Sequence, residues 1–153
     1  MTLRARAIES DADFRSVEVA NLLPKEILPE DRRSGLARVH TGEFDVAAFQ
    51  AMKAVEASVR ATSGLGDNLI GVKLMREAFA PDAGPLTDMN AEGGKRVGRM
   101  ELFTGAIASY KNPHSHRDVN LDNPSEAIEI ILLANHLLRI ADPRATAKNA
   151  GGP

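Results

Sequence analysis

The chain has 153 residues, which suits one domain of ordinary size, and 43% of them are hydrophobic, so a core can form and wholesale disorder is excluded. The 19 Lys and Arg nearly balance the 21 Asp and Glu, so nucleic-acid binding would need a local basic patch rather than an overall positive field. The absence of Cys excludes disulfide scaffolds, thiolate metal sites and cysteine nucleophiles.

Nothing in the chain resembles a membrane span or a leader sequence. The longest purely apolar run covers residues 130–134, whereas a membrane-spanning helix needs about 20 apolar residues. The first residues, Met1-Thr-Leu-Arg-Ala-Arg, lack the apolar stretch of a signal peptide. We therefore expect a cytoplasmic protein without membrane contact.

The sequence predicts an all-α bundle of four to six helices. Aromatic residues are only 4% and no stretch shows sustained alternation of β-branched residues, so strand signals are nearly missing. Residues 10–13 resemble a capping box that starts a helix through Leu22, and residues 29–39 predict a short helix or an irregular stretch. Together they make an N-terminal helical arm, residues 1–40, ahead of a helical domain at 41–142.

A long helix is predicted at about residues 43–60, and the Ser- and Gly-containing stretch 63–66 ends it. Its apolar residues recur at spacings of three and four and make one stripe: Phe44, Ala48, Met52, Val55 and Val59. Glu56 and Arg60 lie four residues apart on this helix, and we expect them to form a surface salt bridge. A third helix is predicted at about 68–79.

Residues 80–98 contain the pairs Gly84-Pro85 and Gly93-Gly94. They predict an irregular surface loop with a small hairpin around Leu86. A fourth helix follows at about 99–110 and ends before Pro113. The basic residues at 95, 96 and 99 either extend a basic surface towards the next loop or solvate the start of this helix.

The last helix has the clearest start, with Asn123 as N-cap, Pro124 at its first position and Glu126 at its third. It is predicted to end at Asp142-Pro143, ahead of a flexible tail at 143–153. Its aliphatic residues cover more than one face of the helix. Because a helix that is apolar nearly all round needs cover on several sides, we expect a homodimer that buries this helix together with the core.

Residues 111–117, Lys-Asn-Pro-His-Ser-His-Arg, lie between two strong helices and form what we call the cationic segment. Histidine can exchange a proton near neutral pH, lysine and arginine can hold a phosphate, and asparagine can orient either group. These parts suffice to cleave RNA without a metal: a base for the 2′-hydroxyl, a cation at the phosphorus and an acid for the leaving oxygen. Because His114 and His116 alternate, one is expected to act and the other to lie on the surface.

Two other uses of the cationic segment stay open. Short polar loops are commonly solvated connectors without chemistry. A metal could also bind His114 and His116, with Asp118 or Asp122 assisting, although no third ligand of matching spacing supports such a site. His136, on the last helix, is expected to be packed or at an interface rather than a ligand.

Several pieces of sequence, in order and over about two-thirds of the chain, carry a resemblance to a known family. They include Phe44-Asp-Val-Ala-Ala, Lys53-Ala-Val-Glu56, Leu102-Phe103-Thr-Gly105, Lys111-Asn112-Pro113 with His116-Arg117, and Leu137-Leu138-Arg139. They resemble the bacterial family first labelled hypothetical protein Ymh, whose C-terminal domain occurs in phage-linked and defence loci. That family looks like the HEPN superfamily of small helical bundles, many of them metal-independent endoribonucleases of toxin–antitoxin and abortive-infection systems.

The HEPN resemblance implies a motif of an Arg, usually a polar residue, and a His after a short gap. Lys111, Asn112 and His116 occupy these places, so it implies catalytic roles for them. Arg117, whose position does not match the motif, and His114 are expected to be peripheral phosphate contacts. It also implies that two copies form a homodimer and share one composite site. Lys111 departs from the pattern, because lysine is a flexible point charge without the planar fork of a guanidinium.

Two functions are therefore expected as alternatives. The first is a metal-independent endoribonuclease of phage defence or toxin type, with RNA as substrate, no metal or cofactor, and an antitoxin or defence protein as partner. The second is a catalytically inactive dimeric helical module that binds a protein partner or nucleic acid. In the second case Asn112-Pro113 only cap helices, and the last helix remains the interface.

Overall fold

The computed structural model describes residues 44–111 and 124–150, with side chains described through Asp142 except at Pro124. Every regular element in these residues is an α-helix, so the predicted all-α class is confirmed. The helices are α3 (Phe44–Ser63), α4 (Gly71–Ala78), α5 (Gly93–Tyr110) and α6 (Pro124–Ala150). The helical pieces predicted within residues 1–40 lie outside this range, and the division of the chain into three parts stays a prediction.

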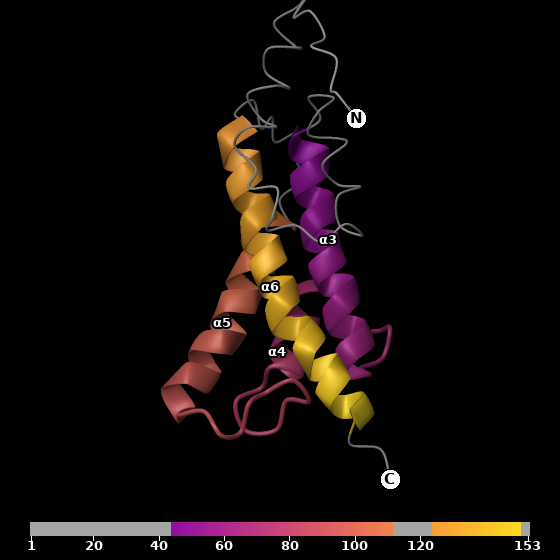
Figure 1. Cartoon of the computed structure of the whole chain (residues 1–153), viewed down its shortest axis with the longest axis vertical. Helices are drawn as coiled ribbons and strands as arrows, with labels where there is room; N and C mark the ends of the chain where they lie inside the picture. The colour runs from indigo at the N-terminus through magenta and orange to yellow at the C-terminus, as the bar shows by residue number, and fades with distance from the viewer. Residues whose placement is uncertain (1–43, 112–123, 151–153) are drawn as a thin grey trace, which may run out of the picture.

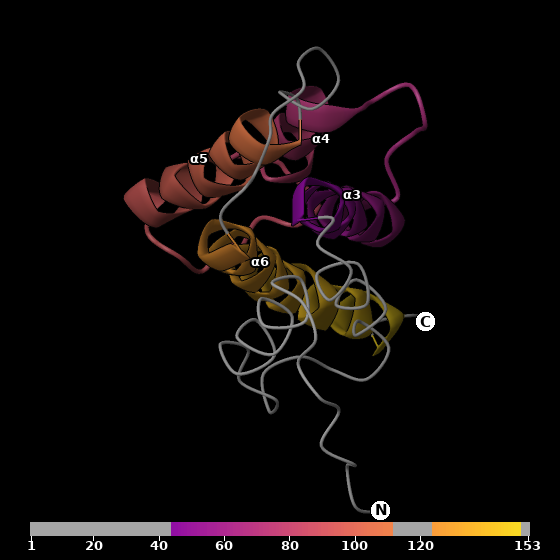
Figure 2. The same cartoon turned by 90° about the horizontal axis from the view of Figure 1, so that it is seen from above.

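The four described helices form two layers (Figure 1). α3 and α6 lie side by side and run in the same direction, and Ser58 Oγ donates a hydrogen bond of 2.8 Å across them to Asp142 Oδ1. Figure 2 shows α4 and α5 together on the other side of α3. α5 runs opposite to α3, so its C-terminal end returns to the flank of α3, and this return builds the candidate site.

α3 follows its predicted apolar stripe. Its buried residues share one face, which packs on the other three helices: Phe44, Ala47, Ala48, Met52, Val55, Glu56, Val59 and Ser63. The helix ends as predicted at the Gly-containing stretch. Gly64 takes a positive φ of 69° and donates its N–H to Arg60 O at 3.2 Å, which is the left-handed end that glycine adopts without strain.

The aliphatic residues of α6 are mostly buried inside the chain itself. Ile128, Ile130, Ile131, Leu137 and Leu138 are each at most 7% exposed. The large hydrophobic side chains that stay exposed in the described part of the chain lie outside α6: Ile70, Met89, Val97 and Leu102. The homodimer through this helix stays a prediction, but the chain's own core already covers most of the apolar surface that suggested it.

The predicted end of the last helix is wrong. α6 begins at Pro124 as predicted, but its backbone stays helical through Ala150 instead of ending at Asp142-Pro143. An interior proline removes one hydrogen bond, and the good helix formers that follow it, in Arg-Ala-Thr-Ala-Lys at 144–148, favour continuation. No described helix has both the length and the apolar character that a membrane crossing requires.

The loop prediction at 80–98 is wrong in two respects. Residues 80–91 contain turns and no strand, so there is no hairpin around Leu86. Leu86 is instead buried, at 1% exposure, and its N–H donates to Ala78 O at 2.9 Å. α5 begins at Gly93, six residues earlier than predicted, because two glycines cost little in the first turn and residues 95–100 continue the helix. The third helix is shorter than predicted, at Gly71–Ala78.

The main core lies between the two layers. Phe79, after α4, and Phe103, on α5, are at most 1% exposed and their rings stack with centroids 4.1 Å apart. Both rings belong to one cluster of buried side chains that also includes aliphatic residues of α3 and α6. A smaller cluster joins the start of α3 to the start of α6 through Phe44, Ile128 and Ile131. The core thereby fixes α3 and α5 relative to each other, and the polar centre described next bridges them.

Candidate functional site

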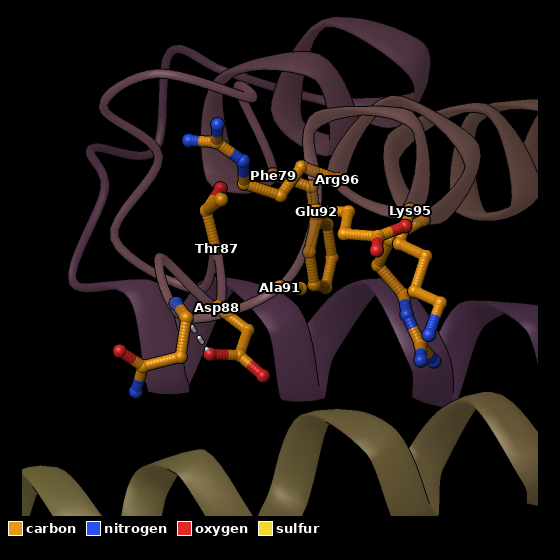
Figure 3. A pocket seen from close by; sticks show the side chains of 9 residues that line it. Phe79, Thr87, Asp88, Ala91, Glu92, Lys95 and Arg96 are labelled. Atoms are coloured by element: carbon orange, nitrogen blue, oxygen red, sulfur yellow. Dashed lines mark hydrogen bonds between the residues drawn. The ribbon is translucent and has the colours of Figure 1, made fainter.

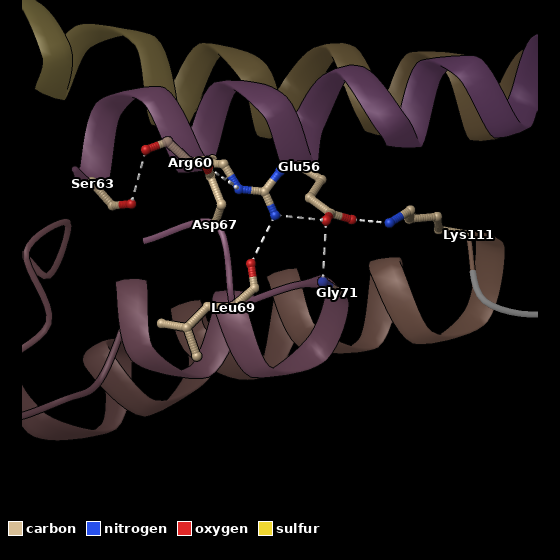
Figure 4. Close-up of polar contacts among 7 residues, drawn as sticks. All are labelled: Glu56, Arg60, Ser63, Asp67, Leu69, Gly71 and Lys111. Atoms are coloured by element: carbon tan, nitrogen blue, oxygen red, sulfur yellow. Dashed lines mark hydrogen bonds and ion pairs between the residues drawn. The ribbon is translucent and has the colours of Figure 1, made fainter. Parts of the chain in front are cut away.

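Lys111, the first residue of the cationic segment, is the one predicted site residue that lies within the described residues. It caps the C-terminus of α5, with its N–H donating to Ile107 O at 3.0 Å. Its side chain is 21% exposed, and its Nζ donates to Glu56 Oε2 on α3 (Figure 4). The first cation of the segment is therefore held by an ion pair to another helix.

Glu56 gathers donors from three elements. Its side chain is only 6% exposed, and besides Lys111 it accepts 3.2 Å bonds at Oε1 from Arg60 Nη2 and from the backbone N–H of Gly71. Gly71 opens α4 at a positive φ of 56°, a conformation that a residue with a Cβ adopts only with strain. One carboxylate thus ties α3 to the start of α4 and to the end of α5.

Arg60 completes this centre and gives it a net positive charge. Its Nη2 also donates to Leu69 O at 2.7 Å, which holds the turn before α4. Its Nε lies 3.9 Å from a carboxylate oxygen of Asp67, a fully exposed side chain that contributes little. The inner group of Glu56, Arg60 and Lys111, which we call the Glu56 centre, carries two cations and one anion.

The pKa of Glu56 is held below its ordinary value of 4.5. Burial alone would raise this pKa, because desolvation disfavours the charged form. The hydrogen bond from Lys111, the N–H of Gly71, the Lys111 charge and the bond from Arg60 together outweigh burial. Glu56 is therefore ionised at neutral pH, and Lys111 faces a permanent counterion.

This lowered pKa predicts a pH dependence of stability. The Glu56 carboxylate should stabilise the fold fully above pH 4.5 and lose that contribution as the pH falls through its lower folded-state pKa. The sign follows because the unfolded chain binds this proton more tightly than the folded chain. The measurement is urea unfolding of the wild type and Glu56→Gln between about pH 7 and pH 3. The difference in unfolding free energy should shrink with acid; a constant difference would contradict the assignment.

The structure corrects the expected role of Glu56 and Arg60. They do pair, at 3.2 Å, but Glu56 is buried, so this is not a surface salt bridge. The sequence did hold a signal: Glu56 lies four residues after Met52 and three before Val59, and so falls on the apolar stripe. A carboxylate on a buried face needs charged or hydrogen-bonding partners.

The other predicted site residues, Asn112, His114, His116 and Arg117, lie outside the described residues, so their roles stay predictions. The same holds for the alternative metal site at His114 and His116. Within residues 44–111 and 124–142, no group of three or more His, Asp or Glu side chains is placed to hold a metal ion. His136 is exposed on α6, so it is not packed inside the chain as one expectation had it.

The fold is a small all-α bundle. Its candidate site is built on an ion pair between the buried Glu56 of α3 and Lys111 at the C-terminal end of α5. The sequence model of the family described as "Protein of unknown function (Hypoth_ymh)" matches residues 33–140, more than half of the chain. The chain belongs to this family, and the Ymh resemblance is confirmed. Neither the curated proteins nor the solved structures include one that matches the chain.

Proposed function

We propose that this protein is an endoribonuclease of the HEPN type that cleaves RNA without a metal, acting in the cytoplasm in phage defence or growth control. The observation that carries the proposal is the position of Lys111. The Glu56 centre fixes its ammonium at the end of α5, where the cationic segment begins, and the centre keeps a net positive charge. A positioned cation provides charge for a phosphate, and the histidines that follow it in the sequence are the proposed proton donors.

In the proposed reaction, His116 of one subunit removes the proton from a ribose 2′-hydroxyl. The 2′-oxygen attacks the adjacent phosphorus, and the 5′-oxygen leaves with a proton from His116 of the partner subunit. Lys111 holds the phosphate with the ammonium protons that Glu56 does not use, and Asn112 orients one of the reacting groups by hydrogen bonding. The products are a 2′,3′-cyclic phosphate and a 5′-hydroxyl end. His114 and Arg117 contact the RNA at the margin, and an antitoxin or defence protein controls the activity.

Replacing His116 by Ala should abolish cleavage and leave helicity and dimerisation unchanged. Removal of a general acid–base group lowers rates by about 100-fold or more. The full-length chain is incubated with total RNA and a chelator, and new 5′-hydroxyl ends are counted. His114→Ala is the matched control and should keep most of the activity. Cleavage that survives in His116→Ala would remove the proposal.

One observation favours a second candidate, a catalytically inactive dimeric module that binds a protein or nucleic acid. The bond between Lys111 and Glu56 joins α5 to α3, and that structural role by itself is a sufficient reason for a cation at this position. This candidate predicts that the wild-type chain generates no new RNA ends at any concentration. It also predicts that His116→Ala binds every ligand as the wild type does.

A further inference from the structure

A cavity lies at the N-terminal end of α5, away from the Glu56 centre. Its volume is about 510 Å³, within the range of small-ligand sites, and it opens between the turns at 87–91 and the first two turns of α5. Arg96, in its lining, lies 15 residues before Lys111, or about 22 Å along the helix. The cavity is therefore separate from Lys111 and the Glu56 centre.

Three cations share the wall of this cavity. Lys95 and Arg96 are adjacent on α5, Arg99 lies one turn further along, and all three line the cavity. In the view of Figure 3, Lys95 and Arg96 extend to opposite sides of the Phe79 ring. In the part of the chain that the structure describes, none of the three forms an ion pair. The guanidinium of Arg96 is instead held by Pro81 O, which accepts from Nη1 at 2.9 Å.

This arrangement is costly without an anion. Like charges on adjacent turns repel, and cations in the first turn of a helix oppose the helix dipole. The Nε of Arg96 is buried and has no hydrogen-bond partner within the described residues. A bound anion would relieve this repulsion.

The remaining lining narrows the chemistry of the ligand. Asp88 and Glu92 place two carboxylates in the same cavity, and Phe79 adds an apolar floor. A bare anion would be repelled by both carboxylates and would have no hydrogen-bond donor to offer them. A ribonucleotide unit carries an anionic phosphate for the cations, together with ribose hydroxyl and base amino groups that can donate to carboxylates.

We propose that the cavity lined by Lys95, Arg96 and Arg99 binds a phosphate-bearing ribonucleotide unit, and that it anchors an RNA strand whose cleaved bond lies at the other end of α5. The choice of RNA over a free nucleotide rests on the proposed function, while the cation cluster rests on the structure alone. A strand that spans about 22 Å along α5 would need several nucleotides, which is within the site size of single-strand binders.

The test measures binding separately from cleavage. A labelled single-stranded oligoribonucleotide of about eight nucleotides is titrated with the full-length chain carrying His116→Ala, so that it is not consumed. Adding Lys95→Gln with Arg99→Gln should weaken binding at least about tenfold and reduce the salt slope by about 1.4. The matched control is Lys53→Gln with Lys73→Gln, which removes the same charge from exposed positions outside the cavity and should change binding by less than about twofold.

A second variant keeps the proposal testable if the first folds poorly. Glu92→Gln removes a carboxylate from the cavity wall, so it should tighten the binding of inorganic phosphate and lose affinity for the ribonucleotide relative to phosphate. Equal binding by the cavity and control double variants would overturn the proposal. So would displacement of the oligonucleotide by inorganic phosphate as readily as by adenosine monophosphate, since that result would show a bare anion site.

Competition by adenosine monophosphate and by unlabelled RNA also shows whether the cavity takes a free nucleotide or an RNA strand. Displacement by adenosine monophosphate at equal nucleotide concentration would support the cavity with a free nucleotide as its occupant, and displacement only by RNA would support the strand anchor. A chain that binds through the cavity but never cleaves RNA contradicts the ribonuclease alone. If Lys95→Gln with Arg99→Gln changes neither cleavage nor RNA binding, that result contradicts the strand anchor and leaves the ribonuclease proposal standing.

Discussion

Glu56→Gln should lower the free energy of unfolding at neutral pH by about 3 kcal/mol. Glutamine has nearly the same size, so Oε1 can still accept from Arg60 and Gly71, but its amide presents N–H groups to the ammonium of Lys111. Removing one partner of a buried pair leaves the other charge without compensation. The low end of the usual range applies because Lys111 and Arg60 are 21% and 28% exposed. Guanidinium unfolding measures the change.

The controls separate the ion pair from a general effect of lost charge. Glu101→Gln, at an exposed position on α5, should change stability by less than about 0.5 kcal/mol. Lys111→Met should cost less than Glu56→Gln, because Glu56 keeps Arg60 and the Gly71 N–H. The double variant should then cost at least about 1 kcal/mol less than the sum of the two single changes. Additive effects would show that Glu56 and Lys111 are not coupled.

The Glu56 centre also decides which substitution tests the chemistry. A loss of cleavage in Lys111→Met would have two explanations, because Lys111 is both the proposed phosphate contact and the structural link between α5 and α3. The substitution that tests the chemistry is therefore His116→Ala, read together with unchanged helicity and with the His114→Ala control. An arginine at 111 would keep the charge but place a larger planar group against a carboxylate that already accepts from Arg60.

Local periodicity predicted the parts of the fold that depend on one segment at a time. The stripe from Phe44 to Val59 gave α3 its buried face, and Pro124 marked the start of α6. The buried role of Glu56 depends on Lys111, 55 residues away, and on the return of α5 that brings the two together. Spacing within one helix carries no information about that return, so Arg60 was the one partner that the sequence could suggest.

The turns before α5 were missed for a similar reason. The sequence showed Gly84-Pro85 as a loop. Leu86 enters the core because Ala78 O accepts its N–H, while Ala80 O accepts the N–H of Gly84. The cavity cations were expected either to extend a basic surface towards the next loop or to solvate a helix start, because their sequence positions do not show that they meet the turns at 87–91. Both features are tertiary, and both depend on how tightly the chain folds back at Gly84.

Gly84→Ala should destabilise the fold by about 3 kcal/mol, a large effect for one methyl group. A Cβ at this position would lie 2.4 Å from Ala80 N, 2.5 Å from Thr87 Oγ1 and 2.7 Å from Ala78 O. Two of these are backbone atoms, which cannot move aside without displacing the turn. Leu86, at 1% exposure, would then leave the core, and the 2.6 Å bond from Thr87 Oγ1 to Ala80 O would break. Thermal and urea unfolding measure the loss.

Gly98→Ala is the matched control, because the same methyl group added on α5 meets no atom within 4 Å apart from its chain neighbours and the backbone of its own helix. Alanine is a better helix former than glycine by about 1 kcal/mol, so this variant should be more stable than the wild type. The two substitutions should therefore change stability in opposite directions, although their chemistry is identical. If Gly84→Ala were as stable as the wild type or more stable, the turn would not be packed as the structure has it. The position of the residues from Thr87 on, which line the cavity, would then be wrong as well.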